Sequence, residues 1–263
     1  MELFYRKLGE SGTPIVILHG LYGASDNWIS IGKQLSLSHQ VYLLDLRNHG
    51  NSPHNNSHKY SDLVADLSEF IQKNEIQKPI LIGHSMGGKT AMLLALQYPS
   101  LISKLIVIDI APRNYNPKST KALEHKELIK TMLAIKLDEF SNRKDIAEKL
   151  NSLILPIRTQ QLILKNIKRE KNKFQWKINL TALQQNLNHL LRGFDNTDSL
   201  KFTKETLFIK AQNSNYIQKE DAEIIKTLFP FALIKEIPEA GHWVHIEQTK
   251  LLISEIKFFL KSV

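Results

Sequence analysis

The chain has 263 residues, 42% of them hydrophobic and 23% charged, a balance typical of a globular, soluble protein with one large α/β domain or two small ones. It contains no cysteine, which excludes a disulfide framework, a thiol nucleophile and thiolate metal sites. No run approaches the ~18 apolar residues of a membrane span, and the N-terminus carries charges where a signal peptide needs an apolar core, so we expect a cytoplasmic protein.

Short apolar runs alternate with helical patterns in the first part of the chain. Residues 3–8 alternate apolar and polar side chains and predict an edge strand. The next strands are predicted from runs that are apolar throughout, as in a sheet covered on both faces, at residues 14–18, 41–46, 80–82 and 105–110. Helical spacing predicts helices at residues 26–35, 62–74 and 89–98. This alternation predicts a mostly parallel, doubly wound sheet.

The pattern changes at residues 113–200, which contain no strand-like run. Amphipathic helices are predicted at residues 119–135, 138–152, 159–168 and 180–191. This segment holds 17 Lys or Arg and 9 Asp or Glu, and so most of the formal net charge of +9. The charge indicates either solvated helix faces or attraction of an anionic ligand. The segment itself is either a stabilising helical subdomain or a lid over a site.

Strands and helices then alternate again to the end of the chain. Strands are predicted at residues 206–211 and 231–237, and helices at residues 219–229 and 246–261. We therefore divide the chain into an α/β core, residues 1–112 and 201–263, and a helical lid, residues 113–200.

A candidate nucleophile lies between the fourth predicted strand and the helix after it. The sequence Gly83-His84-Ser85-Met86-Gly87-Gly88 has the G-x-S-x-G pattern in the strand, turn and helix order of a nucleophile elbow. The glycines allow neighbouring backbone to pass close to the turn, and the helix N-terminus favours negative charge there. The alternative is that Ser85 is only a polar residue in a strand-to-helix turn.

One of the ten histidines follows the last predicted strand. His242 lies in a Gly-containing turn at the carboxyl edge, where open α/β sheets bind ligands. A serine hydroxyl needs a base, and an imidazole suits that role because it changes charge near neutral pH. We therefore predict His242 as the base. The alternative is a histidine that only packs a loop, as we expect for His19 and His49.

The third expected residue is a carboxylate that orients the imidazole. In this chain order it usually follows the strand at residues 206–211, but residues 212–216 contain no Asp or Glu. Asp109 ends the strand after the elbow unit at the same edge of the sheet, and we predict that it is the acid. Its alternative role is to cap the turn that follows. Asp221 is the second candidate and Asp45 the third.

Acyl transfer also needs hydrogen-bond donors for an oxyanion. By position, the donors are the backbone N–H of Met86, directly after the nucleophile, and that of Leu21, directly after the His19-Gly20 pair.

These motifs together resemble those of the α/β-hydrolases over nearly the whole chain. The matching motifs are His19-Gly20, Asp-x-Arg-x-His-Gly-x-Ser from Asp45 to Ser52, Gly-His-Ser-Met-Gly-Gly, and Gly241-His242-Trp243. Within that superfamily the chain is similar to the bacterial YbfF-type esterases and the abhydrolase-domain 11 proteins. The features that point there are Asp109-Ile110-Ala111-Pro112, Trp176-Lys177-Ile178-Asn179, a Ser in the loop at residues 212–216, and Ala240-Gly241-His242-Trp243-Val244-His245.

The resemblance implies an α/β-hydrolase fold with a mostly parallel, doubly wound sheet and a helical lid inserted after strand 6. It also implies an acid after the sixth strand, which supports Asp109. The implied activity is hydrolysis of short acyl esters through an acyl-enzyme, and acyl-CoA thioesters are a further implied substrate class. We expect Ser85, Asp109 and His242 to be catalytic, with no cofactor and no metal ion.

Two other kinds of function stay open on the sequence. A carbon–carbon bond hydrolase or lyase of the same fold would use the same residue types, and a non-catalytic binding protein would keep the fold.

The expected partner is a small acyl ester or thioester. Residues 165–177, with six basic residues and one acidic, are a candidate contact for coenzyme A phosphates. No nucleic-acid motif accompanies the charge, so we expect no nucleic-acid partner. The oligomeric state stays open.

Overall fold

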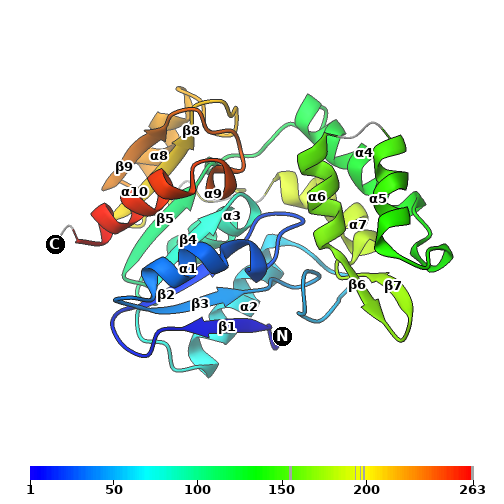
Figure 1. The fold of residues 1–263 in the computed structure, drawn as a ribbon. Helices are drawn as coiled ribbons and strands as arrows, with labels where there is room; N and C mark the ends of the chain where they lie inside the picture. Colours follow the sequence, from blue (N-terminus) through cyan, green and yellow to red (C-terminus); the bar gives the residue numbers. More distant parts are fainter. Residues whose placement is uncertain (154–155, 193, 196, 198, 262–263) are drawn as a thin grey trace.

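A seven-stranded sheet forms the centre of the computed structural model, which describes residues 1–153, 156–192, 194, 195, 197 and 199–261 (Figure 1). The strands of this sheet are β1 (Tyr5–Leu8), β2 (Pro14–Leu18), β3 (Gln40–Leu44), β4 (Ile80–His84), β5 (Lys104–Ile108), β8 (Thr206–Ala211) and β9 (Ala232–Ile237). They lie in the order β1-β3-β2-β4-β5-β8-β9, and all neighbours are parallel except β1, which pairs antiparallel with β3. The predicted mostly parallel sheet with a first edge strand is therefore confirmed.

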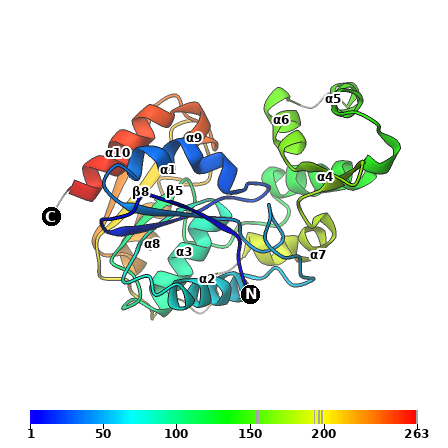
Figure 2. The same ribbon diagram turned by 60° about the horizontal axis from the view of Figure 1, so that its bottom comes forward.

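Helices cover both faces of this sheet (Figures 1 and 2). One face packs against α1 (Ile29–Leu35) and α10 (Thr249–Lys261), and the other against α2 (Tyr60–Lys73), α3 (Met86–Gln97) and α8 (Asp221–Leu228). Two short helices, η1 (Ser25–Trp28) and α9 (Val244–Glu247), lead into α1 and α10. No helix of the described chain is both long and apolar enough to cross a membrane.

Alternate residues of each central strand contribute to two separate apolar layers. In β2, Ile15 and Ile17 pack on the α1 side, whereas Val16 and Leu18 pack on the α2 side. All four are at most 1% exposed. Because both faces are covered, such strands carry no polar face, and this explains their continuous apolar runs in the sequence.

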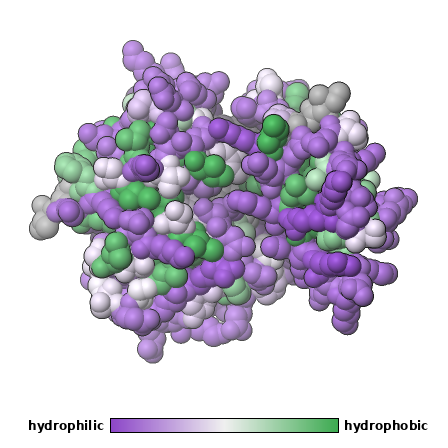
Figure 3. All heavy atoms as spheres, in the orientation of Figure 1, coloured by the Kyte–Doolittle hydropathy of each residue, from purple (hydrophilic) through white to green (hydrophobic). Residues whose placement is uncertain are grey.

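Residues 113–200, which we call the insertion, lie beside the carboxyl ends of the parallel strands (Figures 1 and 2). Its elements are α4 (Thr120–Ala134), η2 (Leu137–Glu139), α5 (Arg143–Ser152), α6 (Ile157–Lys165), β6 (Ile167–Glu170), β7 (Lys173–Trp176) and α7 (Leu180–Leu191). Its visible outer face is largely hydrophilic (Figure 3). The insertion follows β5, which is the fifth strand in chain order of the described residues. The resemblance had implied a position after a sixth strand.

The expectation that the insertion contains only helices was wrong. The helix predicted at residues 159–168 ends at Lys165, and a two-stranded hairpin, β6–β7, follows it. The hairpin turn consists of Lys171 and Asn172, with φ of 46° and 66°. Two residues in the left-handed region are what a tight hairpin turn requires. The strands have four residues each, and half of their eight residues are charged, so their apolar alternation was too short to be recognised.

Buried histidines connect the loops at the carboxyl edge of the sheet. His19 Nε2 accepts a hydrogen bond from the Leu46 N–H at 3.0 Å, and His49 Nε2 accepts one from the Tyr22 N–H at 3.3 Å. Both histidines therefore pack loops, as predicted. Burial lowers the pKa of five histidines at this edge, four in loops or at strand ends and one in α9; they are His19, His49, His58, His84 and His245.

These histidines predict that the protein loses stability in mild acid. The pKa of each of these histidines is lower in the folded protein than in the unfolded chain, where it is near 6.5. For His58 and His245 the pKa in the folded protein is about 3. The neutral histidines therefore make their full contribution to the free energy of unfolding above pH 6.5. This contribution is lost as the pH falls from 6.5 toward 3. Each histidine contributes up to about 1.4 kcal/mol per pH unit.

We expect Tm, measured by circular dichroism, to fall steeply between pH 6.5 and 4.5. The variant His58→Gln should flatten this dependence, whereas substitution of the exposed His189 by Gln should leave it unchanged. A constant Tm across that range would contradict the assignment of neutral buried histidines.

Candidate active site

Ser85 is the single residue between β4 and α3, in the predicted order of strand, turn and helix. Its φ of 52° and ψ of −117° are unfavourable for a residue with a side chain. Tight packing around the turn enforces this conformation: a Cβ on Gly83 would lie 2.4 Å from the Gly87 carbonyl oxygen, and one on Gly87 would lie 2.5 Å from that of His19. Strain of this kind, held by its surroundings, is common at functional sites.

The structure brings Ser85, His242 and Asp109 together, although they follow three different strands. His242 Nε2 lies 3.0 Å from Ser85 Oγ, and His242 Nδ1 lies 2.8 Å from Asp109 Oδ2. Ser85 follows β4, Asp109 follows β5, and His242 lies between β9 and α9. A hydroxyl, an imidazole and a carboxylate in this sequence can move a proton away from the hydroxyl oxygen.

Asp109 is fully buried and holds two further hydrogen bonds. Its Oδ1 accepts the Ala211 N–H at 3.1 Å, and its Oδ2 accepts the Ser214 hydroxyl at 2.5 Å. Together with His242, these donors compensate for the removal of the carboxylate from water. Ser214 was not predicted as part of the site. It lies in the loop at residues 212–216, where the sequence offers no carboxylate.

The other two candidate acids are engaged elsewhere. Asp221 forms an ion pair with Arg113 at 2.7 Å and accepts the Gln218 N–H at 2.8 Å, at the start of α8. Asp45 accepts the N–H groups of Ser25, at 2.6 Å, and Asn51, at 2.8 Å, and so shapes the loops around β3. Their contacts give both residues structural roles, and Asp109 is the carboxylate that meets His242.

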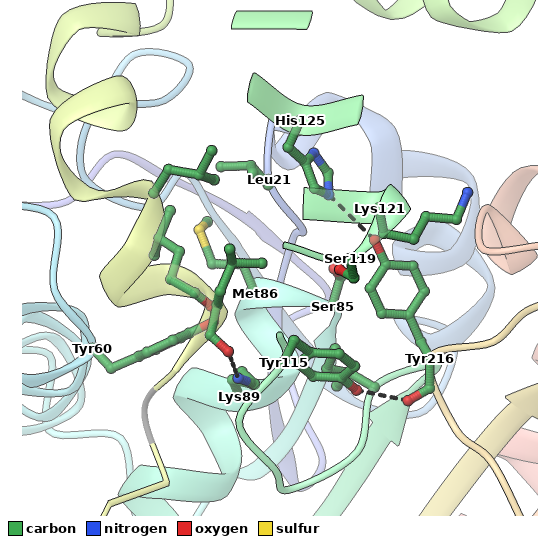
Figure 4. A pocket seen from close by; sticks show the side chains of 14 residues that line it. Leu21, Tyr60, Ser85, Met86, Lys89, Tyr115, Ser119, Lys121, His125 and Tyr216 are labelled. Atoms are coloured by element: carbon green, nitrogen blue, oxygen red, sulfur yellow. Dashed lines mark hydrogen bonds between the residues drawn. The ribbon is translucent and has the colours of Figure 1, made fainter. Parts of the chain in front are cut away.

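Leu21 and Met86 line one cavity with Ser85 (Figure 4). Met86 is the first residue of α3, so its N–H is among those that the helix itself leaves without a partner. The backbone before Leu21 passes close to Ser85, because a Cβ on Gly20 would lie 3.1 Å from the Ser85 Cβ. Both residues therefore border the space that Ser85 faces.

Core and insertion build this cavity together, and it contains about 520 Å³ of empty space that is partly open to solvent. The insertion supplies an apolar wall from the C-terminal half of α7: Leu187, Leu190 and Leu191. A second cavity of about 630 Å³ also reaches Ser85, and His242 and Trp243 line it. Ser85 thus faces two adjoining spaces.

A buried lysine, Lys89, fastens the insertion to the helix that follows Ser85. Its Nζ donates hydrogen bonds to the carbonyl oxygens of Leu191, at 3.2 Å, and Arg192, at 2.5 Å, at the C-terminal end of α7. Burial lowers the pKa of Lys89 to about 7. Three aromatic rings lie 4.9–5.5 Å from the ammonium: Tyr60, Tyr115 and Phe194. Lys89 was not predicted as part of the site; its place directly after the Gly87-Gly88 pair, inside an apolar helix, was the available signal.

Within the part of the chain that the structure describes, no group of three or more His, Asp or Glu side chains lies where it would hold a metal ion.

Comparison with known proteins identifies relatives over most of the chain. The family model described as "alpha/beta hydrolase fold" matches residues 13–249. The "sn-1-specific diacylglycerol lipase ABHD11" of Xenopus tropicalis is 36% identical over 253 residues, which cover 95% of this chain and 79% of that protein. The "Esterase YbfF" of Escherichia coli is 30% identical over 252 residues, which cover 96% of this chain and 94% of that protein.

Solved structures agree with this result. The structure titled "Marine microorganism esterase" is 42% identical and superposes with a TM-score of 0.95, covering 98% of this chain and 99% of that one. The family match, the identities and this superposition together show that the chain belongs to the α/β-hydrolase fold family, and within it to the group that includes ABHD11 and YbfF.

Proposed function

We propose that the protein is a serine carboxylic-ester hydrolase that acts on short-chain acyl esters through an acyl-enzyme. The observation that carries this proposal is the chain of contacts from Ser85 through His242 to Asp109. Relatives described as esterases and as a lipase support an ester as the substrate.

Each of the three side chains has one role in the proposed reaction. Ser85 Oγ attacks the acyl carbon while His242 Nε2 takes the hydroxyl proton, and the resulting tetrahedral oxyanion carries the negative charge. Asp109 keeps the proton on His242 Nδ1 and stabilises the imidazolium. Collapse of the intermediate breaks the bond to the alcohol, which leaves with the proton from His242. Water then repeats the sequence on the acyl-enzyme, releases the acid and restores Ser85.

The oxyanion needs donors in place before the charge develops. We assign this role to the backbone N–H groups of Leu21 and Met86, because both residues border the cavity at Ser85. The α3 N-terminus adds the positive end of its helix dipole at the same point.

We assign the insertion the role of a lid over a core formed by residues 1–112 and 201–263. The support is its position at the carboxyl edge and the leucine wall that α7 adds to the cavity. This wall bounds the cavity of about 520 Å³ at Ser85, which favours a short acyl group. Lys89 holds α7 in this position.

The second cavity gives a leaving group a path toward positive charge. Leu162 and Trp243 line both the second cavity and a third cavity next to it. Lys165 lines this third cavity and also a fourth one. Arg143 and Lys177 also line the fourth cavity, so it holds three basic side chains. This path favours a phosphate-bearing leaving group such as coenzyme A, so acyl-CoA thioesters are included in the proposed substrate range.

A p-nitrophenyl ester series from acetate to dodecanoate, measured with wild type and Ser85→Ala, tests the main proposal. We expect turnover that falls with acyl length and drops by about 10⁴-fold in Ser85→Ala, because the nucleophile is lost. Unchanged turnover in Ser85→Ala would refute the assignment of the nucleophile. No turnover on any ester would favour a carbon–carbon bond hydrolase or lyase, or a non-catalytic binding protein.

The acid is tested by comparing Asp109→Asn with Asp221→Asn. Asp109→Asn should lower kcat about 10³- to 10⁴-fold, because an amide cannot accept the His242 N–H and the Ser214 hydroxyl as the carboxylate does. Asp221→Asn removes an ion pair at the start of α8 and should change kcat less than about threefold. The reverse order of effects would move the acid to Asp221. Melting curves control for folding.

The leaving-group proposal is tested by salt. Raising NaCl from 50 to 500 mM should lower kcat/KM for an acyl-CoA and leave that of a neutral ester with the same acyl group unchanged, because salt screens the attraction of phosphates. The pair of substitutions Lys165→Gln and Lys177→Gln should reduce this dependence. The matched pair Lys130→Gln and Lys149→Gln, on exposed parts of the insertion, should not. Equal salt responses of the two substrates would remove coenzyme A from the proposal.

A further inference from the structure

The ring of Tyr216 lies against the imidazole of His242. The two ring centroids are 3.9 Å apart and the planes differ by 24°, so the rings are stacked. On its edges, the imidazole faces Ser85 and Asp109 through its two nitrogen atoms. The His84 ring is its other aromatic neighbour, with centroids 4.7 Å apart and planes at 40°. Tyr216 therefore covers a face of the ring that the two hydrogen bonds leave free.

The loop that carries Tyr216 also forms a hydrogen bond to the side chain of Asp109. Ser214 donates its hydroxyl proton to Asp109 Oδ2 at 2.5 Å and accepts the Tyr216 N–H at 3.3 Å. The Tyr216 carbonyl oxygen accepts the Tyr115 hydroxyl at 2.6 Å. These contacts fix the backbone of residues 214–216, so the position of the Tyr216 ring is tied to that of the carboxylate.

The hydroxyl of Tyr216 reaches the insertion. It lies 3.2 Å from Nε2 of His125 in α4 (Figure 4). The other nitrogen of His125 lies 3.3 Å from the hydroxyl of Tyr22, in the loop after β2. A neutral imidazole donates from one nitrogen and accepts at the other, so it can bond both phenols at once. Burial lowers the pKa of His125 to about 4, which keeps it neutral at pH 7.

We propose that Tyr216 is a positioning residue for His242, and that His125 of the insertion holds Tyr216 in place. This inference rests on the proposed function of His242 as the base. Hydrogen bonds at both nitrogens fix the imidazole within its own plane, whereas a ring packed on its face limits tilting out of that plane. When His242 takes the Ser85 proton it becomes a cation, and the face of an aromatic ring attracts a cation.

This role differs from that of a residue that only lines the cavity. Tyr216 borders both cavities at Ser85, so loss of a wall contact would weaken substrate binding and act on KM. Loss of His242 positioning acts instead on the proton transfer steps, and so on kcat.

The test compares Tyr216→Leu and Tyr216→Phe on a short p-nitrophenyl ester. Tyr216→Leu should lower kcat about 10- to 100-fold with KM changed less than threefold, and Tyr216→Phe, which keeps the ring, should recover most of this loss. Tyr216→Met gives the same comparison with a side chain of different shape should Tyr216→Leu not fold. Tyr98→Leu, at a tyrosine that is 48% exposed, is the matched control and should leave kcat unchanged.

The contribution of His125 is tested with a double-mutant cycle. His125→Phe and Tyr216→Phe each remove the bond between the two side chains and should each lower kcat about threefold, and the double variant should fall no further than either one. Multiplying effects in the double variant would overturn the link to the insertion.

The outcomes separate this inference from the proposed function. Ser85-dependent turnover in wild type together with a Tyr216→Leu effect confined to KM would overturn the positioning role and leave the esterase proposal intact. Absence of Ser85-dependent turnover in wild type would overturn the proposed function, and the positioning role with it.

Discussion

The parallel pairing of β4, β5 and β8 is the constraint on which the site depends. Its hydrogen bonds continue beyond the strand ends: the Ser85 N–H donates to the Ile108 carbonyl at 3.1 Å, and the Asp109 N–H donates to the Ile209 carbonyl at 2.8 Å. Both residues have positive φ, of 52° and 48°. The sheet therefore holds these two residues, at the ends of adjacent strands, in conformations that a free chain avoids. At the carboxyl edge of the sheet, both side chains contact the imidazole of His242.

The insertion is joined to this edge by buried polar contacts as well as by apolar packing. Lys89, on the core helix that starts after Ser85, bonds the end of α7, and His125, on α4, bonds the hydroxyls of Tyr22 and Tyr216. A buried amine or imidazole is unfavourable unless its hydrogen bonds are formed. These contacts thus favour the one arrangement of insertion and core in which they are satisfied, and that arrangement completes the cavity at Ser85.

The sequence predicted the parts of the site that depend on the sheet. Apolar runs located the strands, and Ser85 and His242 follow two of them, so their meeting at one edge followed from topology. Asp109 was predicted by its place at a strand end and by resemblance, since the loop at residues 212–216 has no carboxylate. Ser214 and Tyr216 were missed because loop residues have no periodic pattern, and which loop side chain reaches a carboxylate or a ring depends on backbone geometry. The β6–β7 hairpin was missed because its strands have only four residues each and half of those residues are charged.

The position of Asp109 explains the other contacts of the loop at residues 212–216. Because the carboxylate that contacts His242 follows β5, the loop after β8 does not have to present one. It instead donates the Ser214 hydroxyl to Asp109 and packs the Tyr216 ring on the imidazole. A carboxylate in this loop would place a second negative charge beside Asp109, and two carboxylates that close disfavour the ionised form of both. The neutral hydroxyl and phenol avoid that repulsion, and they let the loop support the hydrogen bond between Asp109 and His242, which two other segments supply.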